Sequence, residues 1–300
     1  MSPTPALLIT GGTGQLGRDL VAAAGRAGVW VISAPGSAEL DVTDPVAVSD
    51  AVAAAARATG GGGRLVVINA AAYTAVDAAE GAGAARAYAV NAGGAANLAR
   101  ACATHRAHLI QVSTDYVFAG DATRAHRVGD PTAPRTVYGR SKLAGEQAVL
   151  RSAAPAHVVR TAWLYGAHGR NFVRTMAAQA RAAQPVRVVT DQRGNPTWAA
   201  DLAEGLIALA LAGERIPAGV LHCVNTTAAT WFELARAVFV MVGADPDLVR
   251  PCRSAEYPRA APRPANSVLD TTGWTAAGLP PLRPWRAALH AAATAGVLSS

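Results

Sequence analysis

Tyr138 and Lys142 stand at a spacing that lets their side chains act together. Residues four positions apart share one face of a helix, and the segment that joins these two reads Tyr-Gly-Arg-Ser-Lys. A phenol with an ordinary pKa of about 10 becomes useful for proton transfer at neutral pH when a nearby cation favours the phenolate. The pair therefore predicts an acid, Tyr138, whose pKa is lowered by Lys142. A half-buried tyrosine beside an exposed helix lysine is the alternative.

A hydroxyl pair, Ser113-Thr114, follows an apolar run and predicts the third member of such a site. Ligands of open α/β sheets bind at the carboxyl ends of the strands, so we expect Thr114 to lie near Tyr138. Hydride transfer to a carbonyl carbon leaves an alkoxide, which needs a proton and a hydrogen-bond donor. We expect Tyr138 to supply the proton and Thr114 to polarise the carbonyl. Lys142 would also hold the nicotinamide ribose.

A glycine-rich turn near the start of the chain predicts a dinucleotide site. The segment from Gly12 to Gly17 satisfies G-x-G-x-x-G, and Gly11 adds the G-x-x-G-x-x-G spacing. Such glycines let the backbone approach a pyrophosphate at the amino end of a helix. The expected contacts are made by Gly11, Gly14, Gln15, Leu16 and Gly17. An ordinary glycine-rich turn is the alternative, and the strand before it with the helix after it favour the dinucleotide.

The end of the second strand predicts which dinucleotide binds. It reads Ser33-Ala34, without the acidic residue that would hold the ribose hydroxyls of NAD, so we expect NADPH, with NADH as the alternative. Arg18 is a candidate partner for the 2′-phosphate or else a solvated helix residue. We expect Asp41 and Val42 to flank the adenine.

The elements that must position these residues alternate between strand and helix in the first half of the chain, which predicts a doubly wound parallel sheet of the Rossmann type. The expected strands are 6–10, 29–33, 65–69, 107–113 and 157–161, and the expected helices are 15–26, 45–60, 76–105 and 138–151. The alternation weakens later. We therefore divide the chain into a nucleotide-binding domain, 1–160, and a smaller α/β substrate-binding lobe, 161–300, with some elements returning to the sheet. By composition alone, the Pro/Arg-rich stretch 250–264 looks like a linker.

The composition narrows the class of protein. Of 300 residues, 51% are hydrophobic, and the longest apolar runs are too short for an export signal or a membrane helix. The three cysteines show no disulfide or zinc spacing, so we expect a cytoplasmic protein. The net charge of +7 comes from scattered arginines, which favours a small anionic ligand over nucleic acid.

Motifs along nearly the whole chain resemble those of the dTDP-4-dehydrorhamnose reductases, which are extended short-chain dehydrogenases. Besides the glycine turn, they are Glu39-Leu-Asp-Val-Thr-Asp44, Asn69-Ala-Ala-Ala-Tyr-Thr-Ala-Val-Asp77, Asn91, Ser113-Thr-Asp-Tyr-Val-Phe118, Tyr138-Gly-Arg-Ser-Lys-Leu-Ala-Gly-Glu146, Arg160-Thr-Ala-Trp-Leu-Tyr165, Asn171-Phe172, Asp191-Gln192, Gly194, Pro196-Thr197 and Arg263-Pro-Ala-Asn-Ser267. The resemblance implies reduction by NADPH of the C4 keto group of dTDP-4-dehydro-L-rhamnose to dTDP-L-rhamnose.

The resemblance also assigns further site residues. Ala70, Ala71 and Tyr73 would line the cofactor. The sugar pocket would be lined by Thr74, Val76, Asp115, Tyr116 and Trp163, and the nucleotide diphosphate would be held by Asn171, Arg259 and Asn266. The Pro/Arg-rich stretch then becomes a binding segment rather than a linker, because guanidinium groups suit diphosphate oxygens.

Three alternatives stay open. A related dTDP-4-keto-6-deoxyhexose reductase or dihydrostreptose-type synthase of antibiotic deoxysugar pathways would carry nearly the same motifs. A non-catalytic regulatory subunit would keep the fold and lack turnover. A dehydratase is disfavoured, because the order Thr114-Asp115-Tyr116 lacks its Asp-Glu pair. Asp19 has no convincing partners for a metal, so none is expected, and a homodimer is one option for the assembly.

Overall fold

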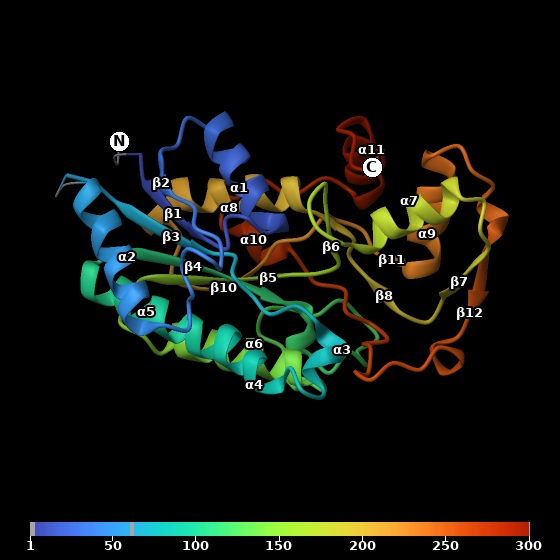
Figure 1. Ribbon diagram of the computed structural model, residues 1–300, viewed down its shortest axis with the longest axis horizontal. Coiled ribbons are helices and arrows are strands. Elements are labelled where there is room, and N and C mark those ends of the chain that lie inside the picture. The colour runs from blue at the N-terminus through green and yellow to red at the C-terminus, as the bar shows by residue number, and fades with distance from the viewer. Residues whose placement is uncertain (1–3, 61–62, 300) are drawn as a thin grey trace.

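A six-stranded parallel sheet forms the centre of the molecule in the computed structural model, which describes residues 4–60 and 63–299 (Figure 1). Its strand order is β10-β5-β4-β3-β1-β2. The strands are β1 (Ala6–Thr10), β2 (Val31–Ser33), β3 (Leu65–Asn69), β4 (His108–Thr114), β5 (Ala156–Thr161) and β10 (Gly219–His222). The predicted doubly wound fold is confirmed. Residues 1–3, on which part of the reading of the amino terminus rested, lie outside the described residues.

Helices cover both faces of this sheet, which explains why its strands are apolar runs rather than alternating ones. One face carries α1 (Gln15–Arg26), α8 (Ala199–Ala212) and α10 (Thr272–Ala276), whose buried residues share one core with β1, β3 and β4. The other face carries α2 (Pro45–Ala58), α5 (Ala95–His105) and α6 (Val137–Leu150). The carboxyl ends of the strands are left open between these layers, and the site is built there.

The predicted continuous helix 76–105 is wrong. It is divided into α3 (Val76–Ala79), α4 (Ala84–Tyr88), the π-helical segment η1 (Ala89–Gly94) and α5. Gly81 and Gly83 fall at the break, where glycine weakens a helix. Gly83 also admits a close neighbour, because a Cβ atom there would lie 2.1 Å from the hydroxyl oxygen of Tyr73.

The amino end of α2 is capped by the residue that precedes it. Asp44 accepts hydrogen bonds from the backbone N–H groups of Val46 and Ala47, and Pro45 occupies the first turn. Gly61 and Gly62, in the glycine run expected to end this helix, lie outside the described residues.

The smaller lobe has its own core, built from α7 (Phe172–Arg181), α9 (Trp231–Met241) and α11 (Trp285–Thr294). Its strands pair two by two: β7 (Val186–Val189) with β12 (Val249–Cys252), β8 (Arg193–Gly194) with β11 (Ala229–Thr230), and β6 (Leu164–Tyr165) with β9 (Thr197–Trp198). Short 3-10 turns complete it: η3 (Gly213–Arg215), η4 (Pro246–Leu248) and η5 (Ser254–Glu256), while η2 (Asp115–Val117) follows β4. Because β10 is an edge strand of the large sheet and α8 packs on that sheet, the second half of the chain contributes to the large sheet as well as to the smaller lobe.

The Pro/Arg-rich stretch is folded against the body and is not a linker. It begins in β12 and then crosses toward α3 (Figure 1). Asp77 of α3 holds it there: its carboxylate accepts from Arg263 Nη2 at 2.7 Å and from the Ala261 N–H at 3.1 Å. The compositional reading as a linker is therefore wrong.

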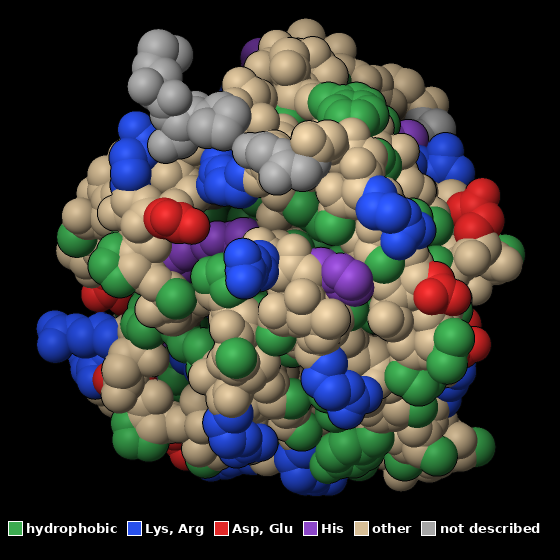
Figure 2. All heavy atoms as spheres, turned by 90° about the vertical axis from the view of Figure 1, so that its left-hand side faces the viewer, with side chains coloured by type: hydrophobic (Ala, Val, Ile, Leu, Met, Phe, Trp, Pro, Cys, Tyr) green, Lys and Arg blue, Asp and Glu red, His purple; other side chains and the backbone are tan. Residues whose placement is uncertain are grey.

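The surface agrees with the scattered basic residues of the sequence. On the face shown in Figure 2, Lys and Arg side chains are separated by other surface rather than joined into one block. Within the described ranges, no helix combines the length and the hydropathy that a membrane span requires.

Candidate active site

The structure brings the three predicted catalytic side chains together at the carboxyl edge of the sheet. Thr114 ends β4, and Tyr138 and Lys142 lie on the first turns of α6. All three residues are buried, with exposed fractions of 6%, 9% and 4%. A hydrogen bond joins the side chains of Thr114 and Tyr138. Hydroxyl, phenol and amine thus share one water-poor site, as carbonyl reduction requires.

The amino end of α6 is fixed from two sides, which sets the position of Tyr138. The Thr136 hydroxyl accepts from the Gly139 N–H at 2.9 Å. Glu80, at the end of α3, accepts from the Val137 N–H at 2.7 Å. A carboxylate at a helix amino terminus also suits the helix dipole.

Lys142 is held by the strand that carries Thr114. Its Nζ donates to the Val112 carbonyl at 2.6 Å. Burial lowers the pKa of Lys142 to about 8, and the nearby Glu146 carboxylate opposes that change. The lysine is therefore a positioned cation that can lose its charge close to neutral pH.

The expected lowering of the pKa of Tyr138 is not what the chain produces. Burial raises this pKa to about 12, the hydrogen bond with Thr114 opposes the rise, and the charge of Asp115 adds to it. The spacing of tyrosine and lysine indicates a nearby positive charge, but it does not reveal the desolvation of the buried phenol, which is the larger effect on this pKa. At neutral pH Tyr138 consequently keeps its proton.

Asn91 ties the β3 loop to the catalytic helix. Its side chain accepts from the Tyr73 N–H at 2.9 Å and donates to the Tyr73 carbonyl at 3.1 Å. It also donates to the Ser141 hydroxyl at 2.9 Å, which in turn donates to the Tyr138 carbonyl at 2.7 Å. Asn91 is buried within the π-helical segment η1, and such segments are frequent at functional sites.

The glycine turn has the shape of a phosphate cradle. Gly11 has a positive φ of 71°, and a Cβ atom there would lie 2.7 Å from the Ala71 nitrogen. At Gly12 a Cβ atom would lie 2.1 Å from the Ala34 oxygen. The N-cap of α1, Gly14, supplies no side-chain cap, so the first N–H groups of this helix are open to an anion.

The neighbours of the turn show how each predicted residue could contribute. Leu16 is buried in the core, which leaves only its backbone for the phosphates. The Ala71 N–H donates to Asn69 Oδ1 at 3.0 Å, which fixes the loop of Ala70 and Ala71 beside the turn. Arg18, the candidate phosphate partner, donates instead to the Thr13 carbonyl at 3.0 Å.

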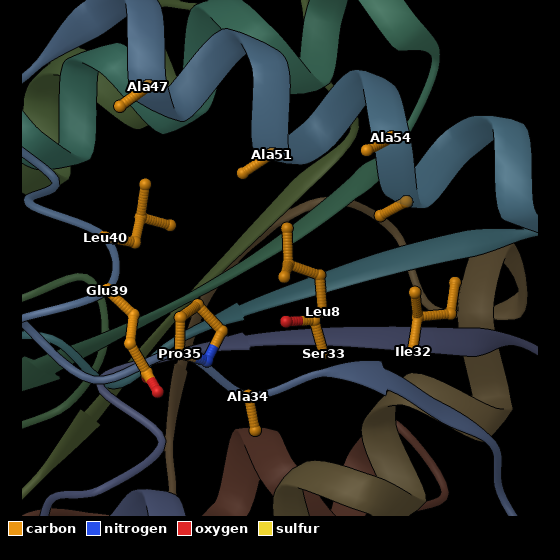
Figure 3. Close-up of a pocket in the computed structure, with 11 residues that line it drawn as sticks. Leu8, Ile32, Ser33, Ala34, Pro35, Glu39, Leu40, Ala47, Ala51 and Ala54 are labelled. Atoms are coloured by element: carbon orange, nitrogen blue, oxygen red, sulfur yellow. The ribbon is translucent and has the colours of Figure 1, made fainter.

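A hollow of about 590 Å³ opens between α2 and the edge strand β2 (Figure 3). It is lined by Ser33, Ala34, Pro35, Glu39 and Leu40 and by small residues of α2. No acidic residue ends β2 itself, and the Glu39 carboxylate accepts from the Gly36 N–H at 2.7 Å.

The two residues expected beside the adenine lie in the loop that precedes α2. The Asp41 carboxylate accepts from both the N–H and the hydroxyl of Thr43 and pairs with Arg86 at 3.3 Å. Val42 is buried, and Gly94 makes room for it: a Cβ atom on this glycine would lie 2.7 Å from Val42 Cγ2.

Part of the predicted sugar pocket gathers around the catalytic tyrosine. Tyr73, Val76 and Tyr116 pack in one apolar cluster with Tyr138, and the rings of Tyr116 and Tyr138 meet edge to face at 5.5 Å. Thr74 is exposed beside this cluster. The side chains that line the predicted sugar pocket thus combine apolar surface with hydroxyl groups, a composition that suits a sugar ring.

The remaining predicted residues contact their own chain. Trp163 stacks on Trp231 with ring centroids 3.6 Å apart and has a positive φ of 47°. Asn171 caps α7 and donates to Gln15 Oε1 at 3.0 Å, which connects the smaller lobe to the glycine turn. Arg259 lies exposed over the ring of Tyr257.

Asn266 has a structural role in this arrangement. Its amide donates to the Ala122 and Arg124 carbonyls at 2.7 and 3.0 Å, and its oxygen accepts from the Val268 N–H at 3.2 Å. With both ends of the amide engaged, Asn266 shapes the 120–124 loop and has no spare donor for a diphosphate.

No group of three His, Cys, Asp or Glu side chains with metal-binding geometry occurs in the described ranges. Asp19, whose place along the first helix had suggested a metal, has a pKa raised by burial. Its Oδ2 atom is buried and makes no hydrogen bond within the part of the chain described.

Comparison with known proteins places the chain in a family. A family model described as the RmlD substrate binding domain matches residues 5–297. The chain belongs to this family. It is 50% identical over 291 residues to a dTDP-4-dehydrorhamnose reductase of Streptomyces griseus, which covers 96% of this chain and 92% of the relative. The resemblance seen in the motifs is confirmed.

Two further proteins are similar to this chain. A Streptomyces antibioticus protein described as a probable dTDP-4,6-dihydroxy-2-methyloxan-3-one 4-ketoreductase is 48% identical over 288 residues, which is 95% of this chain and 93% of the relative. A dTDP-4-dehydrorhamnose reductase from Bacillus anthracis, crystallised with NADP, has a TM-score of 0.88 at 33% identity and covers 98% of this chain and 100% of its own.

The sequence reasoning missed several residues that support this RmlD-family site. Glu146 is one turn beyond Lys142 on α6 and accepts from the Ser113 hydroxyl at 2.5 Å. It also forms a two-pronged ion pair with Arg160, at 3.0 and 2.7 Å. The quoted motifs contained both ends of this pair, yet they meet only because α6, which carries Glu146, packs against β5, which carries Arg160.

Proposed function

We propose that this RmlD-family chain reduces the C4 keto group of dTDP-4-dehydro-L-rhamnose, with NADPH as the hydride donor, to give dTDP-L-rhamnose. The observation that carries the proposal is the burial of Thr114, Tyr138 and Lys142 together beside a glycine turn. The Streptomyces griseus relative of that name, half identical over nearly the whole chain, supports the substrate. The NADP in the Bacillus anthracis structure supports the cofactor.

The residues of the chain fit a dinucleotide. The uncapped amino end of α1 offers backbone donors. A Cβ atom at Gly11 or Gly12 would collide with the backbone of Ala71 or Ala34, so glycine at both positions is what lets the turn adopt the tight shape typical of a pyrophosphate site. The residues that would hold NADPH are Gly11, Gly14, Gln15, Leu16, Gly17, Asp41, Val42, Ala70, Ala71, Tyr73, Tyr138 and Lys142. When bound, this cofactor supplies a hydride for the carbonyl carbon.

The side chains then perform the proton chemistry. Thr114 donates a hydrogen bond to the carbonyl oxygen and stabilises the negative charge that develops there. Tyr138 gives its proton to the same oxygen, which is more basic than a phenolate once it is an alkoxide. The raised pKa of Tyr138, about 12, suits this direction because the phenol is fully protonated at neutral pH. The Lys142 cation stabilises the phenolate that is left.

The wider context is part of the same proposal. The substrate would be a dTDP-linked sugar held by the smaller lobe, and the enzyme would work in the cytoplasm. The three cysteines, all of which are described, are free and buried, as suits a reducing compartment.

A related 4-ketoreductase is the second candidate, because the Streptomyces antibioticus relative is nearly as similar to the chain. Both candidates need the same catalytic trio, so the sugar product separates them. A regulatory subunit is the third outcome, and an assembled trio gives it no support.

The test measures NADPH oxidation by purified protein supplied with dTDP-4-dehydro-L-rhamnose, with the product identified by NMR. Tyr138→Phe should lower kcat by roughly 10²–10⁴-fold, since it removes the proton donor, while NADPH still binds through the glycine turn and Lys142. Tyr88→Phe, at an exposed ring outside the site, is the matched control and should leave kcat unchanged. A different sugar product would move the chain to the second candidate, and NADPH binding without turnover would favour the regulatory subunit.

A further inference from the structure

Asp115 carries a buried carboxyl group that the reaction described so far does not use. The residue is 2% exposed and directly follows Thr114. Its Oδ1 atom is 2.9 Å from the Thr114 hydroxyl. Its Oδ2 atom is buried and makes no hydrogen bond to any described residue. An ionised carboxylate with one oxygen left unpaired in such a place is costly, whereas a protonated one has a proton to share.

The Thr114 hydroxyl has only one proton, and three groups compete for its hydrogen-bonding capacity. It accepts from the Tyr116 N–H at 3.2 Å and is bonded to Tyr138. If Asp115 is ionised, it can only accept, so the hydroxyl proton points at the carboxylate. The substrate carbonyl then receives no hydrogen bond from Thr114. If Asp115 is protonated, its own O–H donates to Thr114, and the hydroxyl proton is free for the reacting oxygen.

We propose that Asp115 is a positioning residue that stays protonated in the reactive complex and thereby turns the Thr114 hydroxyl toward the substrate carbonyl. This inference rests on the proposed function, because it assigns Thr114 the donor role in carbonyl reduction. No proton leaves Asp115 during turnover. The proton that reaches the alkoxide comes from Tyr138, and Asp115 only decides which way the Thr114 O–H points.

The surroundings of Asp115 shift its carboxyl toward the protonated form. Burial raises its pKa to about 6, against the opposing hydrogen bonds of Ser267, Thr114 and the backbone at Asp115 and Tyr116. The carboxyl of the unliganded chain is thus still largely ionised at pH 7, and full protonation requires the further rise that bound ligands bring. The Ser267 hydroxyl is near enough to oppose the rise, yet it does not satisfy Oδ2. The titratable groups on the adjoining elements are phenols, Tyr116 from η2 and Tyr138 from α6, both with raised pKa values.

The charged groups nearby are engaged elsewhere. The Lys142 ammonium on α6 is bonded to the Val112 carbonyl. Arg263, from the Pro/Arg-rich stretch, is paired with Asp77 of α3. No cation is thus bonded to the Asp115 carboxyl in the described chain. A dinucleotide and a sugar diphosphate are anions that also exclude water, so their binding should raise the pKa of Asp115 further.

The experiment compares the pH dependence of kcat for the wild type, Asp115→Asn and Asp115→Leu with saturating NADPH and dTDP-4-dehydro-L-rhamnose. An asparagine amide can donate to Thr114 at every pH. We therefore expect wild-type kcat to fall tenfold per pH unit above the pKa of Asp115 in the complex. Asp115→Asn should stay level, within about threefold of the wild-type maximum, until the pH approaches the pKa of Lys142, about 8, where both proteins lose activity. Asp115→Leu cannot orient Thr114 and should lose about 10²-fold in kcat, with little change in KM.

Controls separate this role from simple packing. Asp50→Asn, at an exposed position of α2, should keep the wild-type profile. An Asp115→Asn protein that is folded by circular dichroism but keeps the wild-type pH limb overturns the proposal. So does one whose kcat falls as far as that of Asp115→Leu.

A second measurement keeps the two proposals distinguishable. The infrared spectrum of the NADPH-bound wild type should contain the stretching band of a protonated carboxyl group. The difference between this spectrum and that of Asp115→Asn should show the band, because the variant lacks the carboxyl. If the wild type lacks turnover, the proposed function fails, and this band still reports whether Asp115 holds a proton. Absence of the band at neutral pH, with or without turnover, overturns the proposal for Asp115.

Discussion

Acid should unfold this protein through a pair of buried histidines on adjacent strands. His108 begins β4, and its Nε2 atom lies 2.8 Å from Nδ1 of His157 on β5. His157 Nε2 lies 3.0 Å from the Pro217 carbonyl, which can only accept, so this nitrogen carries the proton. His157 Nδ1 must then accept from His108. Both rings are therefore neutral in the native state. Protonation of His157 removes the acceptor of this hydrogen bond, and protonation of His108 places an unpaired charge on its buried Nδ1 atom, which has no partner among the described residues.

The magnitude follows from the pKa of His108. Burial, with the charges of His157 and Arg64 acting in the same direction, lowers it from 6.5 to about 4. Below pH 6.5, His108 takes up a proton in the unfolded chain but not yet in the native one. The contribution of His108 to the free energy of unfolding is therefore complete above about pH 6.5 and is lost as the pH falls toward 4. The full shift corresponds to about 3 kcal/mol, of which about 2 kcal/mol is lost by pH 5.

Urea unfolding at about pH 7.5 and pH 5 tests this with His108→Gln, whose amide can donate to His157 without titrating. The variant should lose about 2 kcal/mol less between the two pH values than the wild type does. His290→Gln, at an exposed position of α11, is the matched control and should behave like the wild type. An equal loss of stability in the wild type and His108→Gln would refute the reasoning.

Three further substitutions test the glycine turn, the docked segment and the buried ion pair. Gly17→Ala should abolish NADPH binding in a fluorescence titration, because its Cβ atom would lie 2.1 Å from a backbone oxygen of the turn; binding within threefold of the wild type would contradict this. Asp77→Asn weakens the contact with Arg263 and should raise KM for the sugar nucleotide about tenfold with kcat nearly unchanged; a fall in kcat alone would contradict it. Glu146→Leu leaves Arg160 buried and unpaired and should cost about 3–5 kcal/mol in urea unfolding, much of it restored by adding Arg160→Met.

The sequence predicted those parts of the fold that local patterns decide. The glycine turn and the apolar runs of β1, β3 and β4 are contiguous in the chain, and the structure has them within one residue of the expected bounds. The prediction of one continuous helix over 76–105 was wrong because the many alanines of this segment favour helix and masked the break at Gly81 and Gly83. The close approach of Tyr73 that favours glycine at 83 is a tertiary contact and has no local signal.

Supporting residues were harder to predict than the catalytic trio, because their roles depend on distant partners. Asp77 and Arg263 are 186 positions apart and meet only because the chain returns across α3. The sign of the pKa shift of Tyr138 depends on its burial, which the spacing of tyrosine and lysine does not reveal. Asn171 and Asn266 look like ligand contacts in a sequence, but asparagine caps helices and shapes loops with the same amide.

The placement of the trio also explains why the reaction class was easier to predict than the sugar. Thr114, Tyr138 and Lys142 come from β4 and α6, within the sheet that any such reductase must build. The predicted contacts Trp163 and Arg259 come from the second half of the chain, where short strands pair two by two and carry weak sequence signals. Relatives with different stated products share about half of the residues with this chain. We therefore expect exchange of segments after residue 161 between such relatives to change the sugar that is accepted, while hydride transfer persists.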